Sequence, residues 1–290
     1  MFQDITPHIF DNQYRNVEAE DESYFIYASG GNVLIKENGE FFIPRIGEFD
    51  RGLFRAVYLF SMDGQSFFMP HFLDIESEKA IVRCWKEKSG YTMSHMESFK
   101  DMIPKWLYFA IMTAVQISNW YRNNHFCGCC GKELAHRPDE RALYCPACKN
   151  TVYPKISPAV IVGVVHQNSI LMTKYADRRD GTRYALIAGF AEVGETIEET
   201  VRREVMEEVG LRVKNIQYYK SQPWPFSDSL LLGFFCELDG SGNIILDEKE
   251  LSEAEWVARE DMEVEDDGIS LTYEMMNYFR RQVIYLKSKI

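Results

Sequence analysis

One acidic segment enclosed by glycines constrains the fold more than any other part of the chain. The segment reads GFAEVGETIEETVRREVMEEVGL and runs from Gly189 to Leu211. Thr196 followed three residues later by Glu199 forms a capping box, which predicts the start of a helix. Gly210 is a typical residue just beyond a helix C-terminus. The sequence therefore predicts a short helix between these positions.

The predicted helix carries acidic residues beside an apolar stripe. Glu204, Glu207 and Glu208 are spaced i, i+3 and i+4 and should project from one face. The stripe consists of Val201, Val205 and Val209. Carboxylates on one face repel one another unless a cation lies among them, and their oxygens suit Mg²⁺ or Mn²⁺. The alternative is a solvated acidic face with Arg203 as its ion-pair partner.

Four cysteines have the spacing of a zinc site. Cys127 and Cys130 form one CxxC pair, and Cys145 and Cys148 form another after fourteen intervening residues. Two disulfides are the alternative, but the first residues lack the basic stretch and apolar run expected of a secretion signal, and a reducing cytoplasm would favour zinc. We therefore expect one structural Zn²⁺ and a cytoplasmic protein, with Cys129 outside the ligand set.

Charge and hydropathy exclude two classes of partner. The net charge of −12 argues against broad, nonspecific binding of nucleic acid, which depends on Lys and Arg. No apolar run is long enough to span a membrane. At 46% hydrophobic residues, the chain can instead form substantial cores.

The chain divides into three parts by its patterns. Residues 1–122 form an N-terminal region, residues 123–155 the zinc ribbon and residues 156–290 the catalytic domain. The N-terminal region should contain strands at Ser23–Tyr27, Asn32–Ile35 and Arg55–Phe60. It should end in a long helix at about Phe99–Arg122. The catalytic domain should contain strands at Pro158–Val165, Ile170–Lys174, Tyr184–Ile187, Leu230–Glu237 and Asn243–Leu246, and a helix from about Thr272. This pattern predicts an α/β fold, a mixed sheet between helices in an α/β/α sandwich.

An aromatic, proline-rich segment follows the acidic helix. It reads SQPWPFSDS from Ser221 to Ser229. Two prolines restrict the backbone around Trp224, and Phe226 adds a second ring. Rigid rings beside small polar groups suit a flat heteroaromatic base and its ribose. Taken alone, the segment fits a surface turn with a buried tryptophan better.

Together these motifs resemble a known family. The acidic segment fills every fixed position of G-x5-E-x7-R-E-U-x-E-E-x-G-U, where U is bulky and apolar, and so resembles the Nudix hydrolase box through Gly189, Glu195 and Arg203. A zinc ribbon, this box and then SQPWPF is the arrangement of the NADH pyrophosphatase family. Ser227 stands where the family pattern SQPWPFPxS has proline. The resemblance covers Phe126 to the C-terminus, and residues 1–122 fit the family's N-terminal domain by position.

The resemblance implies two sets of metal ligands. The four cysteines would bind zinc. Catalytic Mg²⁺ or Mn²⁺ would be bound by Glu204, Glu207 and Glu208, by the backbone carbonyl of Ala188 and by a downstream glutamate, Glu250. The catalytic base would be Glu207 or Glu208. A pairing of Glu195 with Arg203 would position the helix.

The resemblance also implies a substrate site. Phe190 would stack on the nicotinamide, while Glu140 and Tyr153 would contact substrate near a dimer seam. The remaining contacts would come from Gln222, Pro223, Trp224, Pro225, Phe226, Ser227, Asp228, Ser229 and Thr272.

The reaction implied is hydrolysis of the pyrophosphate of NADH or NAD⁺ into nicotinamide mononucleotide and AMP by a homodimer. Removal of an NAD cap from the 5′ end of RNA is a related activity. Two alternatives stay open. One is a Nudix hydrolase for another nucleoside diphosphate, such as ADP-ribose or coenzyme A. The other is a zinc-ribbon sensor that binds nucleic acid.

Overall fold

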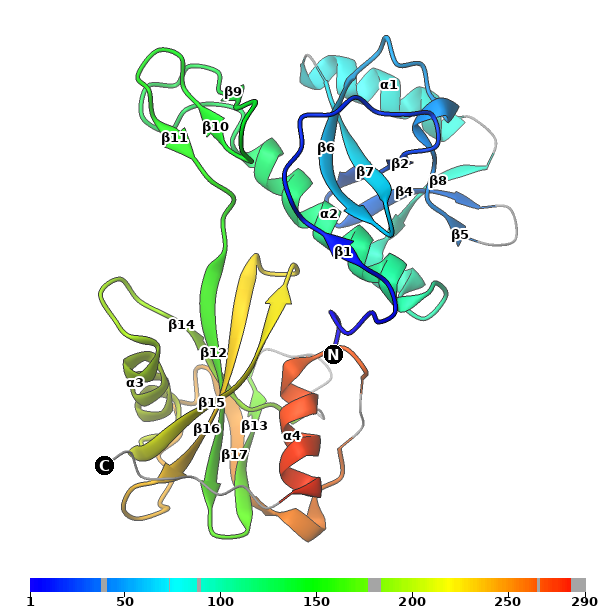
Figure 1. Cartoon of the computed structure of the whole chain (residues 1–290). Coiled ribbons are helices and arrows are strands. Elements are labelled where there is room, and N and C mark those ends of the chain that lie inside the picture. Colours follow the sequence, from blue (N-terminus) through cyan, green and yellow to red (C-terminus); the bar gives the residue numbers. More distant parts are fainter. Residues whose placement is uncertain (38–40, 73, 88–89, 177–183, 265–266, 283–290) are drawn as a thin grey trace. The chain divides into compact units, whose positions relative to one another are not determined.

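The computed structural model describes residues 1–37, 41–72, 74–87, 90–176, 184–264 and 267–282. Its contacts divide the chain into two compact units, coloured by sequence in Figure 1. One unit is Ile5–Lys155, and the other is Met1–Asp4 with Ile156–Ile290. The ribbon residues are thus grouped with the N-terminal region, and the division into three parts stays a proposal.

A six-stranded mixed sheet forms the centre of the second unit. Its main path is β15-β16-β12-β13-β17, with β14 paired to β12. Only the β12–β16 pair among these strands is parallel. The strands are β12 (Ser157–His166), β13 (Ser169–Tyr175), β14 (Ile187–Phe190), β15 (Val213–Trp224), β16 (Ser229–Leu238) and β17 (Leu251–Ala258).

Helices cover both faces of this sheet (Figure 1). Alternate residues of β12 point to opposite faces, so Val160 and Val162 pack in one core cluster and Ile161 in another. The first cluster includes residues of α3 (Ile197–Val209), and the second includes residues of α4 (Leu271–Arg281). A strand buried on both faces reads as a continuous apolar run, as this one does. The expected α/β/α sandwich is confirmed.

Several strand predictions in this unit are confirmed, but two differ from the structure. The third strand begins at Ile187, and Ala185 forms only an isolated bridge with Thr173. The predicted strand at Asn243–Leu246 is wrong. That segment instead runs beside the end of α3, where the Ile245 amide donates to the Val209 carbonyl at 2.9 Å. Its apolar side chains therefore cover the helix instead of extending the sheet.

Strands β15 and β17 were missed by the sequence patterns. β15 is an edge strand, so one row of its backbone groups and many of its side chains face solvent. Pro223 is tolerated there because an edge strand can do without one ladder hydrogen bond. Both strands carry many polar residues and lack a clear apolar alternation.

The Ile5–Lys155 unit contains small sheets and two α-helices around an aromatic core. Phe25, Phe49 and Trp85 pack together in this core. The long helix begins at Lys105, later than predicted, because Pro104 disfavours helical backbone in the residue before it. The elements are β1 (Phe10–Asp11), β2 (Tyr24–Phe25), β3 (Ala28–Ser29), β4 (Asn32–Glu37), β5 (Phe41–Phe42), β6 (Arg55–Met62), β7 (Gln65–His71), α1 (Ile75–Glu87), β8 (Tyr91–His95) and α2 (Lys105–Asn123).

The ribbon adds three short strands to this unit: β9 (Ala135–His136), β10 (Leu143–Tyr144) and β11 (Thr151–Val152). Short 3-10 helices lie at Ile46–Glu48, Met96–Phe99 and, in the other unit, Arg259–Asp261. Within the residues described, none of the helices combines the length and the apolar character needed to cross a membrane.

Candidate functional site

Helix α3 has the termini that its sequence predicts. The Thr196 Oγ1 accepts a hydrogen bond from the Glu199 amide at 3.2 Å, and the Glu199 carboxylate accepts one from the Thr196 amide at 2.7 Å. Gly210 ends the helix in the left-handed conformation, with φ of 67°. Both predicted caps are confirmed, and they fix where each glutamate of the helix points.

The apolar stripe of α3 decides which glutamates are buried. Val201, Val205 and Val209 are completely buried against the sheet. Glu204 and Glu208 are drawn into the same helix–sheet junction and are 8% and 2% exposed. The side chain of Glu207 is 59% exposed. The structure therefore divides the predicted acidic face into a buried pair and one outer carboxylate.

Gly189 lets β14 lie directly against the first buried carboxylate. A Cβ atom built at position 189 would overlap the carboxyl group of Glu204. A side chain at position 189 would therefore displace Glu204 or separate β14 from α3. This close approach accounts for the glycine at the start of the box.

Arg203 joins Glu204 and Glu207 of the helix to Glu195 in the loop before it. Its Nε donates to Glu195 at 2.6 Å, and its Nη1 donates to Glu204 at 2.8 Å and Glu207 at 2.9 Å. Its Nη2 donates to the Phe190 carbonyl at 2.8 Å. These bonds from Arg203 are the main reason that the pKa of Glu195 falls to about 2. The expected Glu195–Arg203 pairing is present. The bond to the Phe190 carbonyl links Arg203 of α3 to β14.

The Glu208 carboxylate has the surroundings of a group that needs a cation. Both of its oxygens are buried, and neither forms a hydrogen bond of ordinary geometry within the described parts of the chain, although the nearby Ala188 backbone opposes the rise in its pKa. Burial raises the pKa of Glu208 to about 8, with further contributions from the charges of Glu204 and Glu250. Burial also raises the pKa of Glu204. A divalent cation bound by oxygen ligands would remove this mutual repulsion.

The negative charges of two further residues, Glu250 and Asp247, affect the pKa values of the buried glutamates. Glu250 is exposed, and its charge raises the pKa values of both Glu204 and Glu208. Asp247 was missed by the sequence reasoning: its amide donates to the Glu208 carbonyl at 2.9 Å, and its charge also acts on Glu208. Its position three residues before Glu250, the predicted downstream ligand, could have indicated that it lies near the same site. Ala188, the predicted carbonyl ligand, lies in β14 opposite Ile161 of β12.

The carboxylates are less tightly gathered than the cysteines. Among the described residues, the four cysteines are the one group of three or more metal-binding side chains with ligand atoms all close together, within 4.8 Å. Glu207 is turned toward Arg203 and Glu250 is exposed. The assignment of a catalytic metal site to these glutamates therefore stays a prediction.

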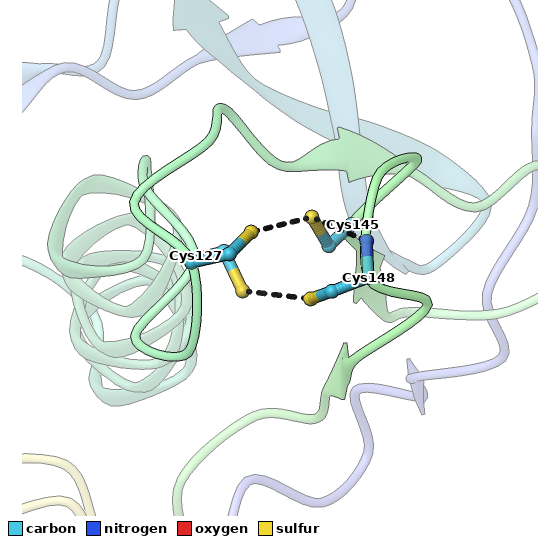
Figure 2. A group of neighbouring side chains, drawn as sticks. Cys127, Cys145 and Cys148 are labelled. Carbon is cyan, nitrogen blue, oxygen red and sulfur yellow. Dashed lines mark hydrogen bonds between the residues drawn. The ribbon is translucent and has the colours of Figure 1, made fainter.

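The cysteine cluster has the geometry of a closed zinc site. The Sγ atoms of Cys127 and Cys148 are 3.6 Å apart, and those of Cys130 and Cys145 are 3.4 Å apart. Figure 2 shows Cys127, Cys145 and Cys148 with their sulfurs turned toward a common space. Cys129 is exposed and outside the cluster, as predicted. Four sulfurs at these separations fit tetrahedral Zn²⁺.

The two halves of the cluster repeat one backbone turn. The Gly131 amide donates to the Cys127 carbonyl at 2.8 Å, and the Lys149 amide donates to the Cys145 carbonyl at 2.9 Å. Both donors are left-handed, with φ of 71° at Gly131 and 67° at Lys149. Amides of Cys130 and Cys129 lower the pKa of Cys127. The turns thus supply donors to thiolates, the form that binds zinc.

The aromatic segment is a hairpin and not a free loop. Ser221–Trp224 ends β15, and Pro225–Asp228 forms the turn into β16. The rings of Trp224 and Phe226 are 4.7 Å apart between centroids, and Phe226 is 39% exposed. The two rings therefore lie next to each other in the turn that joins β15 to β16.

Gln222 has a structural role in this hairpin. Its side chain is completely buried. Its Nε2 donates to the Ile269 carbonyl at 2.7 Å, and its Oε1 accepts from the Leu271 amide at 2.7 Å. These bonds tie the hairpin to the start of α4, so the side-chain amide that was expected to meet substrate is already engaged within the protein.

The first residues of the chain support the same hairpin, which no sequence signal predicted. The Gln3 Nε2 donates to the Ser221 carbonyl at 3.1 Å. Phe2 is fully buried and lies 6.3 Å from Phe226 between ring centroids. More than two hundred residues separate these partners along the chain, so local patterns cannot reveal the contact.

The other predicted substrate contacts lie on different elements. Phe190 is 51% exposed at the end of β14, and Thr272 is half-buried in the first turn of α4. Ser227 and Ser229 share a hydrogen bond of 2.8 Å between their hydroxyls. Glu140 and Tyr153 belong to the other unit, where the Tyr153 hydroxyl donates to Glu140 at 3.3 Å.

Two protein families match this chain. Residues 155–279 match the NUDIX domain. Residues 122–153 match the NADH pyrophosphatase zinc ribbon domain. The two matched segments contain the buried glutamate pair and the cysteine cluster, respectively.

Curated relatives match part of the chain. The NAD-capped RNA hydrolase NudC of Escherichia coli is 45% identical over 148 residues, which is 51% of this chain and 57% of that protein. The proteins of the same name from Shigella boydii and Escherichia fergusonii match at the same identity and coverage. The chain therefore spans little more than half the length of these relatives.

Two Nudix hydrolases are among the solved structures that resemble part of this chain. One is the NUDIX hydrolase from Nitrosomonas europaea, at a TM-score of 0.47 and 22% identity, covering 54% of this chain and 91% of that one. Another is the MutT NUDIX hydrolase from Burkholderia pseudomallei, at a TM-score of 0.36 and 16% identity, covering 45% of this chain and 99% of that one. The chain therefore contains a segment that matches the NADH pyrophosphatase zinc ribbon domain, followed directly by one that matches the NUDIX domain.

Proposed function

We propose that this protein hydrolyses the pyrophosphate bond of NADH or NAD⁺ and releases nicotinamide mononucleotide and AMP. The observation that carries the proposal is the pair of buried carboxyl groups, Glu204 and Glu208, with no hydrogen-bond partner for the Glu208 oxygens among the residues described. Such a pair is costly to bury without a cation. The zinc ribbon and the NudC relatives support the choice of dinucleotide.

Different residues of the chain would bind the cation and accept the proton of the attacking water. Glu204 and Glu208 would bind the cation together with the Ala188 carbonyl, Glu250 and Glu207. Bound Mg²⁺ or Mn²⁺ would neutralise the diphosphate charge and lower the pKa of a coordinated water. Glu207 or Glu208 would accept the proton of the attacking water.

Arg203 would act as a positioning residue. It links Glu195, Glu207 and the Phe190 carbonyl, so it sets the distance between β14 and α3. The Arg203 Nη2 also donates to the second Glu195 oxygen at 3.0 Å, and this bidentate bond gives the link a fixed direction. The box would thus keep Glu204 and Glu208 at a constant separation while substrate enters and product leaves.

Exposed rings would bind the nicotinamide or adenine base. Phe190 follows the box glycine and is 51% exposed, and Trp224 and Phe226 form a ring pair on the hairpin. Aromatic faces stack well on flat bases. The small polar groups of Ser227, Asp228 and Ser229 would meet the ribose, and Thr272 would complete the pocket. Gln222 would contribute by supporting the hairpin.

Removal of NAD caps from RNA is the second activity that we propose. The relatives are named NAD-capped RNA hydrolases, and the scissile pyrophosphate is the same in the free and the RNA-linked dinucleotide. We further propose a cytoplasmic homodimer in which Glu140 and Tyr153 lie near the seam, with a structural Zn²⁺ in each ribbon. Sedimentation and zinc analysis of the purified protein test these two parts.

Product identification tests the main proposal. Purified protein is incubated with NADH, NAD⁺, ADP-ribose or coenzyme A and either Mg²⁺ or Mn²⁺, and the products are separated by chromatography. We expect nicotinamide mononucleotide and AMP from the dinucleotides, with the highest kcat/KM on one of them. Phe190→Ala should raise KM for NADH more than for ADP-ribose, because Phe190 is proposed to stack on the nicotinamide, which ADP-ribose lacks. Preferential cleavage of ADP-ribose or coenzyme A would reject the dinucleotide assignment.

A further inference from the structure

The Ile5–Lys155 unit contains a cavity that none of the proposed site residues lines. Its volume is about 300 Å³, which lies at the lower end of the range for small-molecule sites. The cavity is bounded by residues 26–28, by the end of β7 and by the last turn of α2. All of its lining residues belong to this one unit.

Aromatic rings form much of the cavity wall. Tyr27, Phe72 and Tyr121 line it and are 6%, 9% and 5% exposed, so their positions are fixed by packing. Phe126, a further lining ring, is 61% exposed. Aromatic faces and edges bind flat rings well. The wall therefore favours a planar ligand, and Phe126 is available to cover it.

Ser118 provides an unsatisfied polar group in this wall. The residue is 9% exposed, and its Oγ is buried without a hydrogen-bond partner in the described part of the chain. Leaving a buried hydroxyl unpaired costs about 1–3 kcal/mol. A ligand with a ring nitrogen or amide that reaches Ser118 would recover this energy.

The charges around the cavity disfavour a phosphate. Arg122 lines the cavity, but its Nη2 is held by Glu78 at 2.8 Å. Glu78 also accepts the Tyr27 hydroxyl at 2.9 Å, and Asp74 is a second lining carboxylate. The C-terminal end of α2 adds a partial negative charge. Two histidines, His71 and His125, also line the cavity, and burial lowers the pKa of His71, which favours its uncharged form. Two carboxylates and a helix C-terminus thus outweigh one guanidinium.

We propose that this cavity binds a small heteroaromatic molecule that carries no phosphate and is neutral or singly cationic. The flat ring would lie among Tyr27, Phe72 and Tyr121, with a polar ring atom bonded to Ser118. Free purine bases and pyridine carboxamides have this chemistry, whereas nucleotides do not. The site is therefore distinct in ligand class from the phosphate-cleaving site proposed for the NUDIX domain, and it does not depend on that function.

Methyl NMR on the full-length, zinc-loaded protein tests the proposal directly. Met69 lines the cavity, whereas Met206 is in α3 and serves as the reporter for the other unit. Adenine, adenosine, AMP and nicotinamide are titrated separately without added Mg²⁺. We expect adenine or nicotinamide to shift the Met69 methyl signal in a saturable way, with AMP at least about tenfold weaker than adenosine. No shift of Met69 with any probe, or equal affinity for AMP and adenosine, would overturn the proposal.

Variants locate the binding in the cavity. Ser118→Leu fills the space beside the unpaired hydroxyl, and Phe126→Ala removes the exposed ring. Asn119→Ala, one residue along α2 and not part of the lining, is the matched control. We expect each cavity variant to weaken adenine or nicotinamide binding by about tenfold while the control binds normally, and NADH hydrolysis to be unchanged in all three. If Ser118→Leu does not fold, Phe126→Ala decides: undiminished binding in that folded variant contradicts the assignment.

Discussion

The carboxyl group of Glu204 occupies the space that a side chain at position 189 would need. Gly189 belongs to β14 and Glu204 to α3, so this contact sets the spacing between the strand and the acidic helix. The metal ligands proposed for this site all depend on that spacing.

Gly189→Ala should therefore damage the site more than its size suggests. The added methyl group must displace Glu204 or move β14, and overpacking of this kind costs about 1–3 kcal/mol. We expect a folded protein with at least about a hundredfold loss of kcat for NADH, as is seen when catalytic groups move by about 1 Å. Steady-state kinetics with thermal unfolding measure both effects. Gly128→Ala is the control, because a Cβ there meets no atom within 4 Å; normal turnover in Gly189→Ala would show that Glu204 is free to move.

Glu208 should make the stability of the protein without catalytic metal depend on pH. Its pKa is raised from 4.5 to about 8 in the folded protein, mainly by burial. A group with a raised folded pKa stabilises the fold below its unfolded pKa, and that stability is lost as pH rises through the folded value. Wild-type protein without added Mg²⁺ should therefore lose stability between about pH 4.5 and pH 8.

Glu208→Gln should remove this pH-dependent component. At pH 8 we expect the variant without Mg²⁺ to have a Tm several degrees above wild type, at roughly 2–4 °C per kcal/mol. Added Mg²⁺ should stabilise wild type and leave the variant little changed, and most turnover should be lost in the variant. The buffers are freed of divalent cations with a resin and not with a chelator, so that zinc stays bound. Parallel Tm profiles for the two proteins from pH 5 to pH 8 would reject a raised pKa for the buried Glu208.

Arg203→Lys should lower kcat without removing the fold. Lysine keeps the charge but cannot form the two-atom bond to Glu195 while also reaching the Phe190 carbonyl. Because the role of Arg203 is to position β14 and α3, we expect kcat for NADH to fall about ten- to a hundredfold, with a smaller change in KM. Arg202→Lys is the matched control on the same helix, since Arg202 is exposed and bonds only a helix carbonyl among the contacts described. Equal losses in the two variants would contradict the positioning role.

Lys149→Gly should strengthen the zinc ribbon. Lys149 has a left-handed backbone with φ of 67°, and the equivalent position in the other turn is Gly131. A non-glycine residue there costs roughly 1 kcal/mol, which glycine avoids. We expect slower zinc release to a chromogenic chelator and unchanged zinc content. Lys132→Gly, next to the first turn and without a positive φ, is the control; faster release from Lys149→Gly would show that the lysine side chain matters more than the backbone.

The parts of the fold that the sequence could predict are those set by local rules. The ends of α3 depend on Thr196, Glu199 and Gly210, which are close together in the chain, and the cysteine turns depend on spacing alone. The core strand β12 is predictable because an apolar run buried on both faces has few alternative positions.

The parts that could not be predicted depend on distant contacts. Glu208 is buried and Glu207 is exposed. Which of these neighbouring residues is buried depends on how α3 is rotated about its axis against the sheet, and the helix sequence alone does not determine that rotation. Gln222 was expected at the substrate, but its partners at Ile269 and Leu271 are nearly fifty residues away. β15 was missed because its polar edge lacks the apolar alternation that signals a half-buried strand.

The most direct test of the account is anomalous diffraction from crystals soaked with Mn²⁺ and a non-hydrolysable dinucleotide. We predict a manganese peak within coordinating distance, about 2.0–2.2 Å, of carboxylate oxygens from both Glu204 and Glu208. The bound pyrophosphate should share that ion. Nucleotide bound with manganese peaks only elsewhere in the chain would contradict the central claim that this buried pair binds the cation for pyrophosphate cleavage.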